Sequence, residues 1–463
     1  MARHASAHSA KTPIAGYSKR KVLAWSLWDW GSASFNAVMV TFVFGTYLAS
    51  EAFGADDRGT QYLANANAVG GLIIAATAPI IGMRSDRGGR RKFWLSVNTI
   101  MVCALTAACF FVRPEEGYLL LGVVLLAAGN VFFEFAEINY NAMLVDIAPR
   151  ERMGRVSGIG WGAGYLGGIF LLLIAYVGFI GGESPFWFGV GDENALNIRV
   201  VALFAALWFI LWALPLLLSR TRTAGTPPDG ASAGRTSIVG SYRELFRTLR
   251  DLWANDRNTL IFLISSAIYR DGVGAVFAYG AILGTTVYGI DPGAVLFFGI
   301  FANVVAAVGA FLGGWLDDRL GPRPVIAASL IAMLTVGCVV YFFSDGRQLT
   351  WGGELIYDVS PQDAFWVMGL LLCFFVGPVQ SASRAFLARM VTPERAGELF
   401  GLYATTGRSV SFLAPLAIGI ALALTGSNDS MVLAIMAVIA LGLLSLTLVK
   451  NPQPVRAYQA DEG

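Results

Sequence analysis

The chain has 463 residues, of which 56% are hydrophobic and 14% are charged. This composition excludes a soluble protein with one hydrophobic core and a polar surface, and it predicts an integral membrane protein. The net charge of +2 gives no reason to expect nucleic acid or another polyanion as a partner.

The first 21 residues form a polar tail that contains both histidines of the chain, His4 and His8. The tail is not a secretory signal, because the basic run "YSKRK" precedes a long aromatic-rich segment without a small-residue cleavage site. All four cysteines lie in apolar runs, where a thiol behaves as a small hydrophobe. We therefore expect no disulfide, no metal site and no cofactor.

Twelve apolar stretches are long enough to cross a bilayer, which takes about 20 residues of helix. They lie near residues 24–50, 62–83, 93–112, 117–145, 156–181, 198–219, 258–287, 294–316, 324–344, 364–390, 398–425 and 429–449. The sequence therefore predicts an all-α membrane protein with twelve transmembrane helices.

The segments between these stretches alternate in charge. Basic runs such as "SKRK" and "RGGRRK" alternate with acidic or neutral ones such as "RPEEG" and "TGSNDS". Because positively charged loops stay in the cytoplasm, we expect both termini and the long central connector to be cytoplasmic. The predicted location is the bacterial cytoplasmic membrane, with the chain as a multi-pass protein.

The connector ends with "SYRELFRTLRDLWAND". In this run Leu245, Leu249, Leu252 and Trp253 share a helical face opposite several arginines, which predicts an amphipathic helix on the membrane surface. The predicted division of the chain is a cytoplasmic tail at 1–21, an N-terminal six-helix bundle at 22–219, the cytoplasmic connector at 220–256, a C-terminal six-helix bundle at 257–449 and a second cytoplasmic tail at 450–463.

The two predicted bundles carry the same motif. "GMRSDRGGRRK" at 82–92 and "GGWLDDRLGPRP" at 313–324 share G-x-x-x-D-R-x-G, with each residue of the second motif 232 positions after its counterpart. Each motif falls between the second and third stretch of its bundle. A duplication of six helices with pseudo-symmetry about the membrane normal is therefore predicted, with the substrate site between the two bundles near the midplane.

These stretches resemble the major facilitator superfamily and, within it, the vacuole-effluxer-like family, whose fungal members are regarded as vacuolar amino-acid exporters. The resemblance runs through "WSLWDWGSASF", "NYNAMLVDIAPRERMGRVSGIGWGAGYLGG" and "GPVQSASRAFLARMVTPERAGELFGLY". It implies that Asp86 pairs with basic groups and a helix end in one access state and releases them in the other. The conformational gate it implies comprises Gly82, Asp86, Arg87, Gly89, Arg90, Gly314, Asp318, Arg319 and Gly321.

The family usually shows Tyr-Asn-Asp-Gly where this chain has Tyr269-Arg270-Asp271-Gly272, so Arg270 is a departure. Further polar residues fall on single helical faces at about 100° per residue. Since a charged stripe in lipid costs a few kcal/mol per residue, we expect these faces to line a water-accessible pathway. The candidate substrate-binding residues are Trp25, Asp29, Asn36, Glu134, Glu137, Asn141, Tyr165, Arg270, Asp271, Gln380, Arg384 and Arg408.

These charged residues have a second interpretation, as ion pairs that only hold helices together. The repeat aligns Glu137 with Gln380 and Asn141 with Arg384, so an acidic stripe would face a basic one across the cavity. Such a cavity suits a small zwitterion, whose carboxylate would lie in a guanidinium fork. Arg384 in particular has the alternative role of holding the tenth helix.

We therefore predict a secondary transporter of a small polar, zwitterionic solute such as an amino acid, acting by alternating access as a monomer in the bilayer. No G-x-x-x-x-G-K-[ST] motif is present, so ATP is not the expected energy source. Without a histidine in the membrane, proton coupling would use Glu134, Glu137 or Asp29. A lipid or lysolipid transporter is the alternative. A membrane-embedded enzyme is disfavoured, since neither histidine lies near a plausible nucleophile, and no catalytic residue is predicted.

Overall fold

The protein is helical apart from one β-hairpin. The computed structural model describes residues 18–54, 58–87, 89–219, 238–344, 347–351 and 354–451. Among them, eleven helical segments are long and apolar enough to cross a membrane, and a shorter apolar helix, Ser430–Leu446, follows them. The predicted all-helical membrane fold is confirmed, while the count of twelve crossings depends on this shorter helix.

The N-terminal elements cover the first six predicted stretches, and the first of these runs without a loop from α1 through the π-helical η1 into α2. In chain order the elements are α1 (Lys19–Ser34), η1 (Phe35–Phe42), α2 (Phe44–Leu48), η2 (Glu51–Phe53), α3 (Arg58–Asp86), α4 (Arg91–Ala108), η3 (Cys109–Phe111), α5 (Glu116–Ala142), α6 (Leu144–Ile147), η4 (Arg150–Arg152), α7 (Met153–Ala175), η5 (Tyr176–Ile180), η6 (Trp187–Gly189), η7 (Glu193–Ala195) and α8 (Leu196–Leu218).

The C-terminal elements are α9 (Ile238–Asn255), α10 (Arg257–Thr286), α11 (Pro292–Leu320), α12 (Pro322–Phe342), β1 (Arg347–Trp351), β2 (Glu354–Val359), α13 (Pro361–Met390), η8 (Pro393–Arg395), α14 (Ala396–Val410), α15 (Leu413–Thr425) and α16 (Ser430–Leu446). The N-cap residue's own side chain caps two of these helices. Asp256 accepts the N–H of Thr259 at the start of α10, and Ser360 accepts the N–H of Asp363 at the start of α13.

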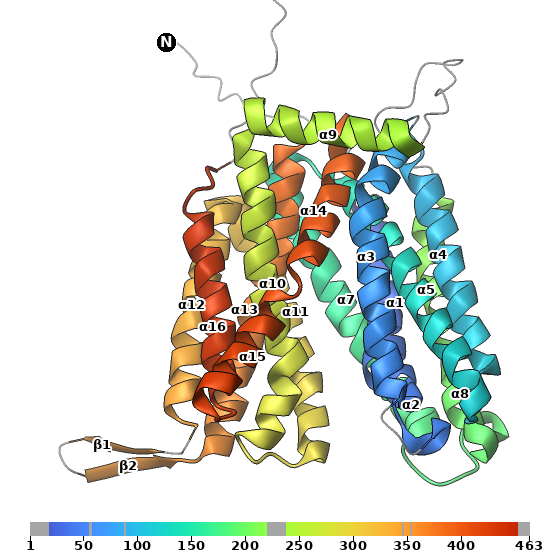
Figure 1. The fold of residues 1–463 in the computed structure, drawn as a ribbon, viewed down its shortest axis with the longest axis vertical. Helices are drawn as coiled ribbons and strands as arrows, with labels where there is room; N and C mark the ends of the chain where they lie inside the picture. Colours follow the sequence, from blue (N-terminus) through green and yellow to red (C-terminus); the bar gives the residue numbers. More distant parts are fainter. Residues whose placement is uncertain are drawn as a thin grey trace, which may run out of the picture.

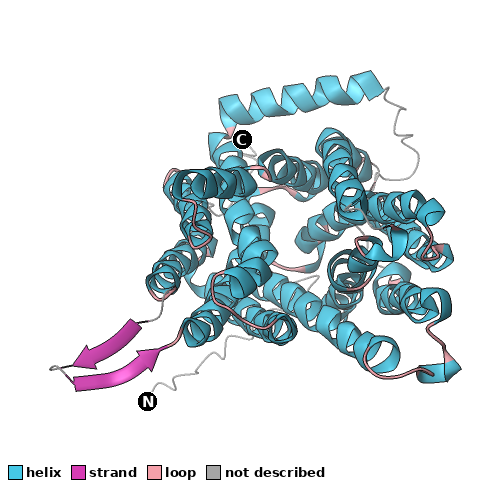
Figure 2. Cartoon of the chain, turned by 60° about the horizontal axis from the view of Figure 1, so that its bottom comes forward, coloured by secondary structure: helices cyan, strands magenta, loops and turns pink. Residues whose placement is uncertain are grey.

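The antiparallel hairpin β1–β2 was not foreseen in the predicted loop between the ninth and tenth stretches. Arg347 pairs with Val359 in its register, and it projects sideways from the helices (Figures 1 and 2). We call the end of the molecule that carries it the hairpin end, and the opposite end, which α9 crosses, the α9 end (Figure 1).

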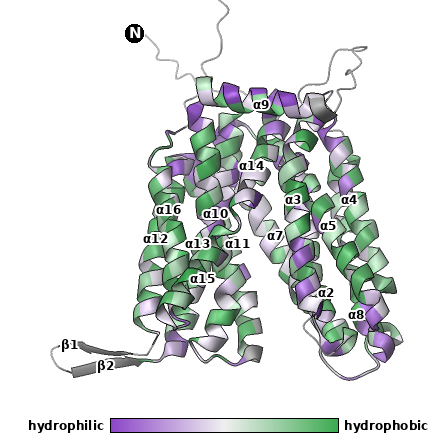
Figure 3. Ribbon diagram, in the orientation of Figure 1, coloured by the Kyte–Doolittle hydropathy of each residue, from purple (hydrophilic) through white to green (hydrophobic). Residues whose placement is uncertain are grey.

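The helices form two sets. In the first set α1 packs on α7 and α8 and α4 packs on α5, while in the second set α11 packs on α13 and α10 packs on α16. The two sets lie next to each other in Figure 1 and meet along two seams, α7 against α11 and α3 against α14. The outer helices α12 and α16 are hydrophobic along most of their length, and hydrophilic residues gather on α9 (Figure 3).

The seam between α3 and α14 is tight only at the α9 end. Residues 396–402 of α14 and residues 78–80 of α3 are buried. Toward the hairpin end, most of α15 is exposed, and so are Asn65 and Asn67 of α3. Asn67 lines a cavity of about 190 Å³, so this half of the seam is less tightly packed.

The connector helix α9 packs against the protein. Leu252 is buried, Leu245 and Leu249 pack beside the core, and Trp253 is 62% exposed at the edge of that face. The face predicted to lie on the membrane surface therefore packs its three leucines against the protein, because the helix ends beneath α9 supply the apolar surface that covers them. Residues 1–17, 220–237 and 452–463 of the predicted tails and connector lie outside the described residues.

A close crossing of α1 and α7 holds the first set together. A Cβ at Gly167 of α7 would lie 2.2 Å from the carbonyl oxygen of Trp30 on α1. Backbone cannot yield as a side chain does, so only glycine allows the two helices to approach this closely.

We expect Gly167→Val to lower the free energy of unfolding by about 1–3 kcal/mol, measured by thermal unfolding of the purified protein in detergent. The matched control is Gly71→Val on α3, where a Cβ would meet nothing within 4 Å. Equal destabilisation by both substitutions would show that helix propensity, rather than the crossing, sets the effect.

Candidate functional site

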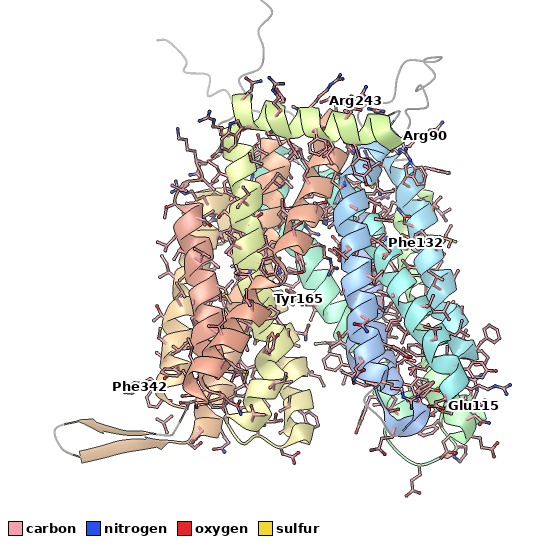
Figure 4. All side chains as sticks on the ribbon, in the orientation of Figure 1. Arg90, Glu115, Phe132, Tyr165, Arg243 and Phe342 are labelled. Atoms are coloured by element: carbon pink, nitrogen blue, oxygen red, sulfur yellow. The ribbon has the colours of Figure 1, made fainter. Side chains whose placement is uncertain are left out.

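Two cavities lie among the helices of the two sets. The first has a volume of about 600 Å³ and is lined by α5, α7, α10, α13, α14 and α15. The second, of about 430 Å³, is lined by α1, η1, α5, α7, α10 and α11. Glu137, Trp161, Gly274 and Ala278 line both cavities, so the two spaces share one wall. Tyr165 of the second cavity lies between the two sets of helices (Figure 4).

The structure brings most of the predicted substrate-binding residues to these cavities. The first cavity is lined by Glu134, Glu137, Asn141, Arg270, Asp271, Gln380, Arg384 and Arg408, and the second by Asp29, Asn36, Glu137 and Tyr165. Trp25 lines neither. It is fully buried, its ring stacks on Tyr140 at 4.4 Å, and its indole N–H donates to the Tyr140 carbonyl.

Arg384 is committed to contacts within the protein. It is 3% exposed, and its Nε and Nη2 donate to the hydroxyl and the carbonyl of Ser157 at 2.9 and 2.6 Å. Its Nη1 donates to Asn141 at 3.1 Å and to Asp29 at 3.3 Å. All three partners belong to the first set of helices, so Arg384 ties α13 to that set.

The pocket around Arg384 depends on Gly160. A Cβ at that position would lie 2.7 Å from Arg384 Nη2 and 2.9 Å from a carboxylate oxygen of Asp29. Asp29 also accepts a hydrogen bond of 2.9 Å from the Tyr140 hydroxyl. The carboxylate thus has two fixed donors and still lines the second cavity.

Three further charged residues of the first cavity have partners in the protein. Arg408 of α14 forms an ion pair with Glu134 of α5, across the two sets. Asp271 accepts the N–H of Ala414 at 2.7 Å, so it caps the start of α15, where the chain breaks after α14. The interpretation as structural ion pairs, left open by the sequence, describes the contacts of Arg384, Arg408 and Glu134.

Arg270 differs from the other two arginines. Its guanidinium lies 3.7 Å from the centroid of the Tyr403 ring, and its Nη1 is buried without a hydrogen-bond partner. Gly407 makes room for it, since a Cβ there would lie 2.8 Å from Arg270 Nη2. A buried donor without a partner costs about 1–3 kcal/mol, and the Arg270 side chain lines the first cavity.

Glu137 and Gln380 also line the first cavity. In the part of the chain that the structure describes, neither side chain has a hydrogen bond or an ion pair. The first cavity therefore contains one guanidinium, one carboxylate and one amide whose bonding capacity is not used by the protein.

At the α9 end, Asp86 closes the seam between α3 and α14. Its two carboxylate oxygens accept the N–H groups of Gly397 and Glu398, at 2.9 and 2.8 Å, in the first turn of α14. Arg91, fully buried, donates to Asp86 at 2.6 Å, to Asp146 at 3.1 Å and to the carbonyl of Pro393. A negative charge at a helix N-terminus is favourable, so this contact holds the two sets together.

Asp318 closes the other seam in the same way. It accepts the N–H groups of Gly154 and Arg155, at 2.9 and 3.3 Å, at the start of α7. Arg389 donates to Asp318 at 3.2 Å and to the buried Asp317 at 2.6 Å. We call the Asp86 and Asp318 contacts with their arginines the two gates.

Glycines bring the helices of each gate into backbone contact. A Cβ at Gly82 would lie 2.0 Å from the carbonyl oxygen of Gly397, and one at Gly314 would lie 2.4 Å from that of Gly154. Gly89 and Gly321 have φ of +62° and +88°, a conformation that favours glycine. The repeated motif therefore recurs as a repeated structure.

The remaining predicted gate residues lie beside these contacts. Arg87 pairs with Glu244 of α9, Arg319 lies 3.7 Å from the ring centroid of Trp315, and Arg90 is exposed at the start of α4. The sequence reasoning missed Arg91 and Arg389, the two arginines that hold the gate carboxylates.

The spacing of the repeat could have identified one of these two arginines, Arg389. Arg389 lies 243 positions after Asp146, the same spacing that aligns Asn141 with Arg384, and each of the two is a gate partner. The role of Ser157 in holding Arg384 had no such signal, because its partner is 227 residues away. Among the described residues, no group of three or more His, Cys, Asp or Glu side chains could hold a metal.

Two helical sets that enclose central cavities and meet through paired gates define a transporter of the major facilitator type. Solved structures of that superfamily share the fold. The proton:xylose symporter XylE aligns with a TM-score of 0.68 at 12% identity, over 93% of this chain and 95% of that one. The transporter FucP in its outward conformation aligns with a TM-score of 0.64 at 15% identity, over 93% and 98% of the two chains.

Within that superfamily, the chain belongs to the vacuole effluxer Atg22-like family, whose model matches residues 52–457. An uncharacterised major-facilitator-type transporter, YxiO of Bacillus subtilis, is 26% identical over 92% of this chain and 94% of its own. Autophagy-related protein 22-2 of Aspergillus clavatus is 22% identical over 58% of this chain and 43% of its own length. The alignment with this fungal relative thus spans less than half of it.

We expect Asp86→Asn and Asp318→Asn each to raise the ratio of open to closed α9 ends by about tenfold, since each loses charge-assisted hydrogen bonds worth about 1.5–3 kcal/mol. The measurement is the distance distribution between spin labels at Phe93 and Thr392, two exposed positions at this end. Asp429→Asn at the hairpin end, where Asp429 bonds Ser427, is the control. An unchanged distribution in both variants would contradict a gating role.

Proposed function

We propose that the protein is a secondary active transporter that exports a small zwitterionic solute, such as an amino acid, by alternating access. In this proposal Ser430–Leu446 supplies the twelfth crossing, and the sets α1–α8 and α10–α16 are the two six-helix bundles. The protein acts as a monomer and not as an enzyme. The single observation that carries the proposed substrate class is the pair of unused opposite charges, Arg270 and Glu137, in one cavity.

The α9 end is cytoplasmic in this proposal. Arg90 and Arg243 lie at that end and Glu115 lies near the hairpin end (Figure 4), which follows the rule that cytoplasmic segments carry the positive charge. The two gates then close the cytoplasmic side, and the less tightly packed half of the α3–α14 seam faces outward. The likeness to FucP in its outward conformation supports an outward-facing state.

The two unused charges set the proposed substrate class. An amino acid would place its carboxylate on the free N–H of Arg270 and its ammonium on Glu137, with Gln380 available as a neutral partner. Hydrogen bonds between ionised groups are about twice as strong as neutral ones. Arg384 and Arg408 are assigned structural roles, because their donors already bind Ser157, Asn141 and Glu134.

The charged lining disfavours the alternative of a lysolipid. A lysolipid needs a long apolar channel for its acyl chain, whereas the first cavity is lined by six acids and bases in addition to its apolar residues. These are the acids Glu134, Glu137 and Asp271 and the arginines Arg270, Arg384 and Arg408. The description of the family as vacuole effluxers supports export.

Glu137 also offers a way to couple export to protons. A single carboxylate can hold either a proton or the ammonium of the substrate, but not both. Alternate occupancy of Glu137 exchanges one cation for the other, which is the balance that proton-driven export requires. Glu134 is already paired with Arg408, and Asp29 holds Arg384. In this proposal these two carboxylates respond to the change in charge at Glu137 and do not bind the proton first.

We expect Arg270→Gln to weaken the binding of amino acids by about tenfold to a hundredfold, because the charge-assisted bond to the carboxylate is lost. The measurement is isothermal calorimetry with a panel of amino acids. Arg113→Gln, at an exposed arginine near the hairpin end, is the control. Unchanged affinity in a folded Arg270→Gln variant would rule out this arginine as the carboxylate ligand.

We expect the affinity of the wild type for amino acids to fall as the pH falls, since protons compete with the ammonium for Glu137. In Glu137→Gln the affinity should be lower and no longer depend on pH, because an amide neither carries a proton nor attracts a cation as strongly. Calorimetry across a pH series measures both, with Glu115→Gln as the control. A pH dependence that survives in Glu137→Gln would place the coupling elsewhere.

A further inference from the structure

The helix α9 presents three different faces along its length. One face is buried against the protein and carries Ser241, Leu245, Thr248 and Leu252, of which Ser241, Thr248 and Leu252 are buried. At about 100° per residue, the side chains of Phe246 and Trp253 lie roughly a quarter turn or more from that face. These two aromatic side chains are 69% and 62% exposed.

The third face is basic. Arg243 and Arg250 lie on the side of α9 opposite the buried face, at about 100° per residue. Arg247 lies between that side and a cleft that it lines together with Asp86 and Glu398. All three are exposed, and among the described residues none has a hydrogen bond or an ion pair. Figure 4 shows Arg243 on the side of α9 that points away from the helices.

The place of α9 in the fold indicates what covers its two exposed faces. α9 crosses the ends of membrane-spanning helices and lies at the edge of the molecule (Figures 1 and 2), at the level where the bilayer has its headgroups. Exposed aromatic residues and arginines together on an interfacial helix match this layer, because aromatic rings enter the boundary with the acyl chains and arginines attract anionic phosphates.

We propose that α9 binds the anionic phospholipids of the cytoplasmic leaflet, with Arg243, Arg247 and Arg250 on the headgroups and Phe246 and Trp253 beneath them. This binding holds the gate of Asp86 closed, so lipid charge sets the access equilibrium of the transporter. The proposal rests on the two-state gating in the proposed function, but it does not depend on which solute is carried.

Three contacts link α9 to this gate. Glu244 pairs with Arg87, the residue after Asp86. On the other set of helices, Thr248 donates to the Glu398 side chain, and Glu398 supplies one of the two N–H groups that Asp86 accepts. The contacts of α9 therefore bracket Asp86 from both sides.

A third link reaches the loop before α14. Asp251 of α9 lies 3.6 Å from Arg395, which also bonds Glu398 at 3.1 Å. When the two sets part at this end, Arg87 and Glu398 move away from each other, and α9 cannot keep both contacts. A surface that fixes α9 in its present position therefore favours the closed gate, since only differential contacts shift such an equilibrium.

The test uses the full chain in nanodiscs, with spin labels at Phe93 and Thr392, and compares phosphatidylcholine alone with phosphatidylcholine containing phosphatidylglycerol. We expect phosphatidylglycerol to raise the ratio of closed to open gates by about five- to tenfold, the scale expected for a few arginines at an anionic surface. The triple variant Arg243→Gln, Arg247→Gln, Arg250→Gln should abolish this response. Phe246→Ser should reduce it by removing the aromatic contact.

Two controls make the test specific. Arg113→Gln near the hairpin end should leave the response to phosphatidylglycerol unchanged. Soluble glycerophosphoglycerol, which has the headgroup without a bilayer, should have no effect; an equal effect would mean that a free anion rather than the membrane is bound, and would overturn the proposal. An identical closed fraction in both lipids, or a full response in the triple variant, would overturn it as well. No solute is added in this test. Its outcome therefore does not depend on whether the protein transports amino acids.

Discussion

The closed arrangement of the α9 end depends on one interaction made twice: an aspartate from one set of helices binds the N-terminal turn of a helix from the other. Asp86 and Asp318 each accept two backbone N–H groups, which have no partner inside their own helix. These hydrogen bonds break completely when the helices part. The contact is therefore either formed or absent, unlike a long-range electrostatic attraction that weakens gradually with distance. Gly82 and Gly314 bring the backbones close enough for this contact to form.

The contacts of Asp86 and Asp318 hold the α9 end closed. The charged side chains that line the cavities then determine which solutes the cavities can bind. Burying an ion in a low-dielectric site is costly unless it is paired, and most ions here are paired across the two sets of helices. Arg384 binds Ser157 and Asn141, and Arg408 binds Glu134. Among the described residues, Arg270 and Glu137 of the first cavity have no ion-pair partner, and the proposed function assigns the solute's opposite charges to them.

The duplication is preserved in the backbone and altered in the side chains. Asp29 holds Arg384, while Asp271, which lies 242 positions later in the repeat, caps α15. Asp146 receives Arg91 in the first gate, whereas the residue aligned with it, Arg389, is itself the donor in the second. The same fold thus supplies two similar gates and one asymmetric cavity, because gates use the backbone N–H groups that every helix has and the cavity uses side chains.

The sequence by itself determined the membrane-spanning helices, the repeated gate motif and the polar faces, because hydrophobic length, loop charge and helical period are local properties of the chain. It placed Glu137 and Arg270 on faces that reach a cavity. Only the tertiary structure decided which charges stay free. Arg384 meets Ser157 and Asp86 meets Gly397 across more than two hundred residues, and pairings at such separations follow from how helices pack, which no local pattern encodes.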